Sequence, residues 1–121
     1  MTMTIEERRS LSKMLMRLFD LWGLADEEQA AVLGYSPKNL EVIRKYRSGE
    51  PLADRQELIE RAGILLVIHE ELRIIFPHNL ELAYSWVRMK NKRFDNRMPL
   101  EVMLEDIEGL RFIRNYLSGV V

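Results

Sequence analysis

Apolar residues recur at helical spacing along nearly the whole chain. In residues 5–22 the apolar positions Leu11, Leu15, Leu18 and Trp22 fall on one face of a helix. No segment shows the apolar–polar alternation of a strand. The pattern predicts an all-α protein of about seven helices. Later apolar stripes are formed by Ala30 and Leu33, by Leu40, Ile43 and Tyr46, by Leu58, Ala62, Leu65 and Leu72, by Leu82 and Trp86, and by Leu110, Ile113 and Leu117.

Glycines, prolines and short polar residues mark the expected helix ends. Gly23, Gly34 and Gly49 follow the first three helices, and Pro77 stops a long fourth one. The expected N-caps are Asp26, Ser36 (with Pro37 at the first helical position), Asp54 (in a capping box with Glu57), Asn79 and Asp106, and Pro99 opens the sixth helix. The chain is expected to form two parts, residues 1–77 and residues 78–121.

Composition narrows the classes of function. With 121 residues, 47% hydrophobic and 31% charged, the chain can bury a core and remain soluble. The net charge of −1 means that any nucleic-acid surface must be a local patch. The absence of cysteine excludes disulfides and thiolate zinc sites. The start, MTMTIEERRS, lacks the apolar core of a signal peptide, and the longest apolar run, residues 64–68, is too short for a membrane span. We expect a cytoplasmic protein.

Signals for catalysis are weak. His69 begins the sequence HEELR, which is similar to a zinc-protease helix, but that motif needs a second histidine where Arg73 stands. His69 is therefore expected at the edge of the core. The glycines stand singly, so no phosphate-binding loop is present. We expect no enzymatic activity, no metal and no cofactor.

The segment DEEQAAVLGYSPKNLEVIRKYRSG has the layout of a helix-turn-helix, in which the second helix can enter the major groove of DNA. Its second half is locally basic, and the candidate DNA contacts are Lys38, Asn39, Arg44, Lys45 and Arg47. The alternative is an ordinary helical packing motif with a solvated charged face. Two residues argue against DNA, because Gln29 stands where an apolar residue is usual and Glu41 would mostly be repelled.

A second basic patch lies near the end of the chain. Residues 88–97 carry Arg88, Lys90, Lys92, Arg93 and Arg97 against only Asp95, and the last helix adds Arg111 and Arg114 one turn apart. These arginines are suited to pairing with carboxylates of a partner, and Phe94 and Tyr116 are suited to anchoring an interface. The alternative is that Phe94 holds the loop onto the core and that the arginines are solvated.

Both parts of the chain together resemble the Xre/MbcA/ParS antitoxin family. The residues that carry the resemblance are LWGLADEEQAAVLGYSPKNL and LIERAGILLVIHEELRIIFP, similar to the Xre-like helix-turn-helix domain, and WVRMKNKRFDNRMPLEVMLEDIEGLRFIRNYL, similar to the toxin-binding domain. The family commonly has a glycine and a small residue before Pro-Leu, where this chain has Asn96, Arg97 and Met98. Asn96 tolerates a left-handed conformation, so the turn can form.

The resemblance implies a bacterial type II antitoxin, with residues 1–77 as the Xre-like domain and residues 78–121 as the toxin-binding domain. Its partner would be a cognate toxin, often a RES-domain enzyme that consumes NAD, and the helix-turn-helix could bind the promoter of its own operon. The candidate toxin contacts are Arg93, Phe94, Arg97, Arg111, Arg114 and Tyr116. The rival readings are a helix-turn-helix transcriptional regulator without a toxin partner and a plain helical interaction module.

The first helix also suggests self-association. It is apolar on more than one side, through Met3, Met14, Met16, Phe19, Leu21 and Leu24. A single core can cover only one stripe of a helix. We therefore expect a homodimer or a larger assembly.

Overall fold

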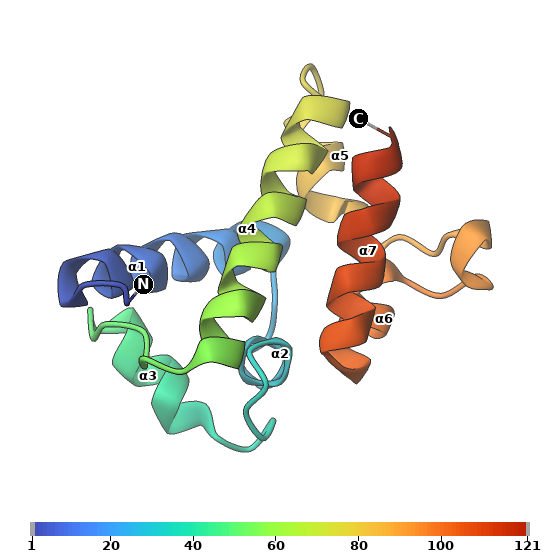
Figure 1. The fold of residues 1–121 in the computed structure, drawn as a ribbon. Coiled ribbons are helices and arrows are strands. Elements are labelled where there is room, and N and C mark those ends of the chain that lie inside the picture. The colour runs from blue at the N-terminus through green and yellow to red at the C-terminus, as the bar shows by residue number, and fades with distance from the viewer. Residues whose placement is uncertain (1, 121) are drawn as a thin grey trace. The chain divides into compact units, whose positions relative to one another are not determined.

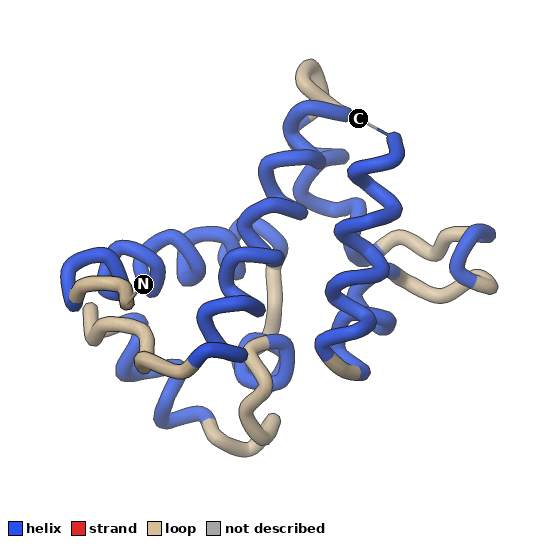
Figure 2. The backbone as a smooth tube through the Cα atoms, in the orientation of Figure 1, coloured by secondary structure: helices blue, strands red, loops and turns tan. Residues whose placement is uncertain are grey.

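The computed structural model describes residues 2–120, and within them it consists of helices joined by loops (Figure 2). The elements are α1 (Ile5–Trp22), α2 (Asp26–Val32), α3 (Leu40–Arg47), α4 (Gln56–Ile75), α5 (Leu80–Ser85), the 3-10 helices η1 (Trp86–Arg88) and η2 (Lys92–Phe94), α6 (Pro99–Glu105) and α7 (Ile107–Val120) (Figure 1). The predicted all-α fold of about seven helices is confirmed.

The chain divides into two compact units, and the boundary between them along the sequence falls inside α4. The N-terminal unit extends to Gly63 and the C-terminal unit begins at Ile64. The predicted division into functional domains after residue 77 stays a prediction. The boundary between the compact units comes earlier in the sequence than residue 77, because the second half of α4 belongs to the C-terminal unit.

The first helix begins and ends as local rules require. A capping box starts it, because the Thr4 hydroxyl accepts from the Glu7 amide at 3.1 Å and the Glu7 carboxylate accepts from the Thr4 amide at 2.8 Å. Gly23 ends it with a φ of 66°, in the left-handed region that glycine favours. The predicted glycine stop is confirmed.

Three predicted N-caps in the N-terminal unit are wrong. Asp26 is the first helical residue of α2, because Ala25 takes the cap position and its amide donates to Glu28 Oε1 at 2.8 Å. Ser36 instead accepts from the Lys38 amide at 3.2 Å, so it closes a turn, and α3 starts later with Asn39 as its cap. Helix α4 begins at Gln56, and its first backbone hydrogen bond runs from the Ile59 amide to the Arg55 carbonyl. The cap position is therefore Arg55, one residue after the predicted Asp54.

The predicted helix starts of the C-terminal unit are confirmed. The Asn79 side chain accepts from the Leu82 amide at 3.1 Å and caps α5. Pro99 occupies the first turn of α6. The Asp106 carboxylate accepts from the Gly109 amide at 2.8 Å at the start of α7. Side-chain caps such as these satisfy amides that the helix itself leaves without partners.

Helices α6 and α7 form the tightest pair of the C-terminal unit. Leu100 and Met103 on α6, and Leu110 and Ile113 on α7, are fully buried. The predicted inner stripe of the last helix is therefore confirmed. At Gly109 the two helices approach so closely that an added Cβ would lie 2.9 Å from the carbonyl carbon of Val102 and closer still to its oxygen. Only glycine fits at this crossing.

Half of the apolar residues that suggested a dimer are buried within the single chain. Met16, Phe19 and Leu24 are buried within the single chain, while Met3 and Leu21 are partly exposed. Met14 remains 47% exposed. Only Met3, Met14 and Leu21 thus remain for contact with a second copy, and the dimer stays a prediction.

Replacing Gly109 with alanine is expected to destabilise the C-terminal unit by more than about 2 kcal/mol, because the new Cβ would meet the Val102 backbone, which cannot move aside as a flexible side chain would. Thermal and urea denaturation followed by circular dichroism would measure the loss. Gly119→Ala is the matched control in the same helix. A Cβ there meets nothing within 4 Å, so this change should be neutral or stabilising by at most about 1 kcal/mol. Equal stability of the two variants would contradict the close crossing.

Candidate functional site

The turn between α2 and α3 is held from inside the N-terminal unit by Arg61. This side chain is buried on α4, donates from Nη1 to the Val32 carbonyl at 3.3 Å and has Glu57 at 3.6 Å. Gly34 has a φ of 89°, and a Cβ at this position would lie 3.0 Å from Arg61 Nε. Arg61 thus supplies a donor for the carbonyl end of α2, where the helix leaves acceptors without partners.

Two tyrosines connect this turn to α3 and to the loop after it. The hydroxyls of Tyr35 and Tyr46 lie 2.8 Å apart, and the Ala53 amide donates to the Tyr46 hydroxyl at 3.3 Å. The guanidinium of Arg55 lies over the Tyr35 ring, 5.7 Å from its centre. Burial, followed by the hydrogen bond with Tyr35, raises the pKa of Tyr46 to about 12. Tyr46 therefore acts as a neutral hydrogen-bonding core residue.

All five candidate DNA contacts are exposed residues of the helix-turn-helix. Lys38 lies in the turn before α3, and Arg44 and Lys45 are exposed on α3 itself. Asn39 is exposed as well, but its side-chain oxygen accepts from the Val42 amide at 3.3 Å and caps the helix. The Oδ1 atom of Asn39 is thus used by the cap, and only the side-chain amide nitrogen remains to contact DNA.

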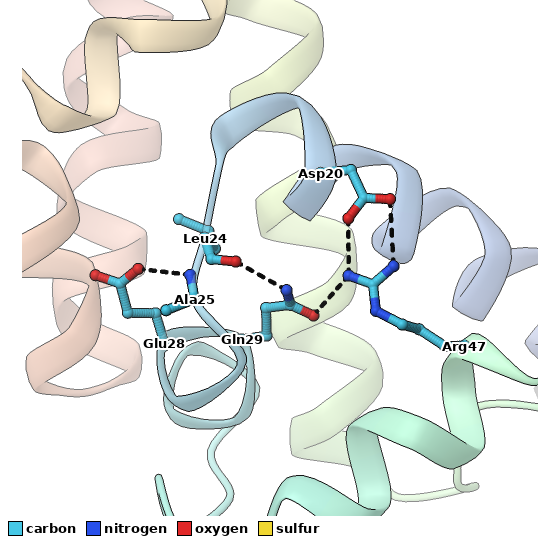
Figure 3. A network of polar contacts seen from close by, with 6 residues as sticks. All are labelled: Asp20, Leu24, Ala25, Glu28, Gln29 and Arg47. Atoms are coloured by element: carbon cyan, nitrogen blue, oxygen red, sulfur yellow. Dashed lines mark hydrogen bonds and ion pairs between the residues drawn. The ribbon is translucent and has the colours of Figure 1, made fainter.

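The fifth candidate, Arg47, is exposed too, with 36% of its side chain accessible, and a polar network binds it to α1 and α2 (Figure 3). It donates to both carboxylate oxygens of Asp20, at 2.8 Å and 3.2 Å, and to Gln29 Oε1 at 3.1 Å. Gln29 is buried and donates to the Leu24 carbonyl at 2.9 Å. Gln29 stands where the sequence analysis expected an apolar residue. Both ends of its side-chain amide have a hydrogen-bond partner, as buried polar groups normally do.

The loop from Asn91 to Met98 is a folded structure of its own, seen as the orange segment before α6 (Figure 1). The Asn91 amide donates to the Arg97 carbonyl at 3.1 Å, and the Asn91 carbonyl accepts from the amides of Phe94 and Asn96, each at 3.0 Å. Asp95 and Asn96 have φ values of 56° and 61°. The predicted left-handed conformation of Asn96 is confirmed, and it lets the turn form without the glycine.

The ring of Phe94 holds this loop against α7. Its centre lies 5.0 Å from that of Tyr116, 5.8 Å from that of Phe112 and 6.2 Å from that of Trp86, in each case edge to face. Trp86 and Tyr116 stack at 6.3 Å. Phe94 is only 5% exposed. The structure thus places it where the alternative reading expected it, inside the aromatic cluster formed by Trp86, Phe94, Phe112 and Tyr116.

The candidate arginines of the C-terminal unit differ in their surroundings. Arg93 is exposed at the loop. Arg97 forms an ion pair with Glu105, and Arg111 forms one with Glu108. Arg114 is partly buried and donates to Asn115 Oδ1 at 3.4 Å. Arg93 adjoins Phe94 in the loop and Arg111 adjoins Phe112 on α7, whereas Arg114 lies two residues from Phe112 and so on another side of α7. Arg97 ties the loop to α6.

Residues 71–120 match the family model of the antitoxin Xre/MbcA/ParS C-terminal toxin-binding domain. This confirms the predicted resemblance for the C-terminal part and supports the role of an antitoxin in a toxin–antitoxin system. A toxin-binding domain also favours a regulatory protein over an enzyme. No curated protein matches the chain.

The toxin-binding domain contains an exposed residue that the sequence predictions missed. Phe112 is 53% exposed on α7, next to Arg111, and contacts the buried ring of Phe94. The signal was present in the sequence, because Leu110, Ile113 and Leu117 define the inner stripe of this helix and Phe112 falls outside it. An exposed aromatic residue beside cations is typical of interface anchors.

Other chemistry finds little support within residues 2–120. His69 is partly buried and stacks on Tyr84, with ring centres 5.7 Å apart. In this part of the chain no three or more histidine, aspartate or glutamate side chains group together as metal ligands would. Among the same residues no helix has the length and apolarity that a membrane crossing requires.

The raised pKa of Tyr46 predicts a pH dependence of stability. The folded state keeps the hydroxyl proton up to about pH 12, whereas an ordinary tyrosine loses it near 10.0. The stabilisation is therefore complete below pH 10 and is lost as the pH rises through 12. Urea denaturation at pH 8 to 12 should show this loss in the parent chain and a shallower one in Tyr46→Phe. Tyr84→Phe, changed in the other unit, should keep the parent's profile, and an unchanged profile in Tyr46→Phe would contradict the prediction.

Proposed function

We propose that the protein is an antitoxin whose C-terminal domain binds a cognate toxin and obstructs its active site. The observation that carries this proposal is the match of residues 71–120 to the toxin-binding domain. As the sequence resemblance implies, the toxin is proposed to be a RES-domain enzyme that consumes NAD. The NAD chemistry would belong to that partner, and this chain would contribute no catalytic group.

The proposed docking surface comprises Arg93, Arg111, Phe112 and Arg114. Phe112 supplies an exposed aromatic anchor, and the arginines supply donors for carboxylates of the toxin. The loop adds Arg88, Lys90 and Lys92, all exposed, against Asp95. A partner with an acidic patch around an apolar pocket would complement this surface.

Phe94, Arg97 and Tyr116 support this surface from within the domain. Phe94 is buried under Phe112 and Tyr116, so it fixes where the basic loop lies. Arg97 pairs with Glu105 across the end of the same loop. Their replacement is expected to move the docking residues rather than to remove a direct contact.

The ion pair that Arg111 makes in the free chain does not prevent docking. Glu108 is exposed one turn before Arg111 on the same helix. Exposed pairs of this kind contribute about 0–1 kcal/mol. A charge pair that is buried in a protein interface typically costs about 2–5 kcal/mol when one partner is truncated. The exposed pair with Glu108 can therefore be given up with little loss of stability, whereas a buried toxin carboxylate that lost Arg111 would carry a large penalty.

Replacing both Arg111 and Arg114 with alanine should strongly weaken neutralisation, because each truncation leaves a toxin carboxylate without its partner. A growth assay with the neighbouring gene co-expressed would measure rescue, and circular dichroism should show unchanged helix content. The control is Lys13→Ala with Arg17→Ala, which removes two exposed cations at helical spacing from α1.

The possible results distinguish an error in the proposed docking surface from an error in the antitoxin proposal itself. Phe112→Ala tests the apolar anchor of the same surface. If the double arginine variant and Phe112→Ala both rescue growth as well as the parent chain, α7 is not the docking face. If the parent chain itself neither rescues growth nor binds the product of the neighbouring gene in a pull-down, the antitoxin proposal is wrong for that partner.

We further propose that the helix-turn-helix of the N-terminal unit binds the promoter of the protein's own operon, with the chain as a dimer. The supporting observation is that Lys38, Arg44 and Lys45 are exposed in the turn before α3 and on α3 itself. If these cations contact phosphates, each replacement by alanine should lower the slope of log affinity against log salt by about one unit. Fluorescence anisotropy with the upstream duplex and with a random duplex would measure the slope and the preference. Equal affinity for both duplexes would remove the operator proposal and favour the antitoxin role alone.

A further inference from the structure

The structure assigns to Arg47 a role in positioning the recognition helix α3, in place of a contact to DNA phosphate. We infer that Asp20, Gln29 and Arg47, called here the Arg47 network, fix α3 relative to α1 and α2. The inference rests on the proposed DNA binding and changes which of the basic residues serve it.

The network joins three helices of the N-terminal unit through one side chain (Figure 3). Arg47 is the last residue of α3, Asp20 lies in the last turn of α1, and Gln29 lies inside α2. In a helix-turn-helix the second helix lies in the major groove while the first crosses the DNA backbone, so binding depends on how the helices are held together. A contact that joins all three helices therefore determines the angle at which α3 is presented.

The guanidinium has little capacity left for a bidentate phosphate contact. Its two terminal nitrogens donate to the two oxygens of Asp20, at 3.2 Å and 2.8 Å, and Nη2 also donates to Gln29 at 3.1 Å. Both N–H groups of Nη2 are thus occupied, and this nitrogen belongs to each of the two edges that could bind a phosphate in a bidentate manner. A phosphate bound in a bidentate manner would have to displace Asp20 or Gln29, whereas Nε and the second N–H of Nη1 can still donate to a single phosphate oxygen.

Gln29 cannot turn away from this arrangement easily. Its side chain is 2% exposed, and its amide nitrogen donates to the Leu24 carbonyl at 2.9 Å. The carbonyl end of the amide is therefore directed at Arg47. A leucine or alanine at this position would leave one partner of the guanidinium missing, which gives a physical reason for a polar residue on the inner face of α2.

The charge of Asp20 makes the inference testable by the sign of an effect. Removing a carboxylate near a DNA-binding surface should tighten DNA binding if charge alone matters, because phosphates repel it. If Asp20 holds Arg47 and thereby α3, removing the carboxylate should weaken binding instead. The two explanations thus predict opposite changes for one substitution.

The experiment uses the full chain and a duplex that carries the promoter upstream of its gene. Asp20→Asn is expected to bind about tenfold more weakly than the parent, with the parent's salt slope. Arg47→Ala should show the same loss, also at an unchanged slope, and the double variant should be no weaker than either single one. Glu50→Gln, an exposed acid just after α3, is the control and should bind as well as the parent or better.

Amide hydrogen exchange without DNA tests the network independently of any operator. Asp20→Asn and Arg47→Ala should reduce the protection of the α3 amides, and Glu50→Gln should not. Unchanged α3 protection, tighter binding by Asp20→Asn, or a salt slope lowered by about one unit in Arg47→Ala would each overturn the inference. If the parent chain does not prefer its promoter, the operator proposal fails, and the exchange result still decides whether Arg47 positions α3.

Discussion

The close crossing of α6 and α7 at Gly109 is the constraint on which the candidate toxin-binding surface depends. Because this residue has no Cβ, the start of α7 can lie directly against the backbone of Val102. That approach buries Leu110, Ile113 and Leu117 and so determines which side of α7 faces outward. Phe112 is exposed as a consequence, Arg111 and Arg114 are partly exposed, and the Phe94 ring then fixes the basic loop next to Phe112.

In the N-terminal unit, buried polar side chains fix how the helices pack. Two of the polar side chains buried in this unit are Gln29 on α2 and Arg61 on α4. Each has a defined partner, Leu24 and Arg47 for Gln29 and the Val32 carbonyl for Arg61. Directional hydrogen bonds specify one arrangement of helices more strictly than apolar contacts do, at the cost that each partner must be present. Such specificity suits a unit that presents a recognition helix.

Periodicity predicted the helices because burial follows the apolar stripes, and Asn79, Pro99 and Asp106 carry capping chemistry that acts within one turn. Two of the wrong caps have local causes that the sequence pattern does not rank, since Glu28 accepts from the Ala25 amide and so places the cap before Asp26, and Ser36 accepts from the Lys38 amide in a turn. The environments of Arg47 and Phe94 were beyond sequence reasoning for another reason. Asp20 and Phe112, which decide them, are 27 and 18 residues away along the chain, so only the tertiary fold brings them together.

The boundary between the two units shows which residues the toxin-binding domain needs in order to fold. The family match begins at residue 71, but the compact C-terminal unit begins at residue 64, inside α4. Glu71 accepts from the Ser118 hydroxyl at 2.9 Å, and His69 stacks on Tyr84, so this half of α4 is joined to both α7 and α5. Leu65, Ile68 and Leu72 are fully buried. A segment that begins at residue 78 would lack these contacts, which makes the second half of α4 a structural part of the domain that presents Arg111 and Phe112.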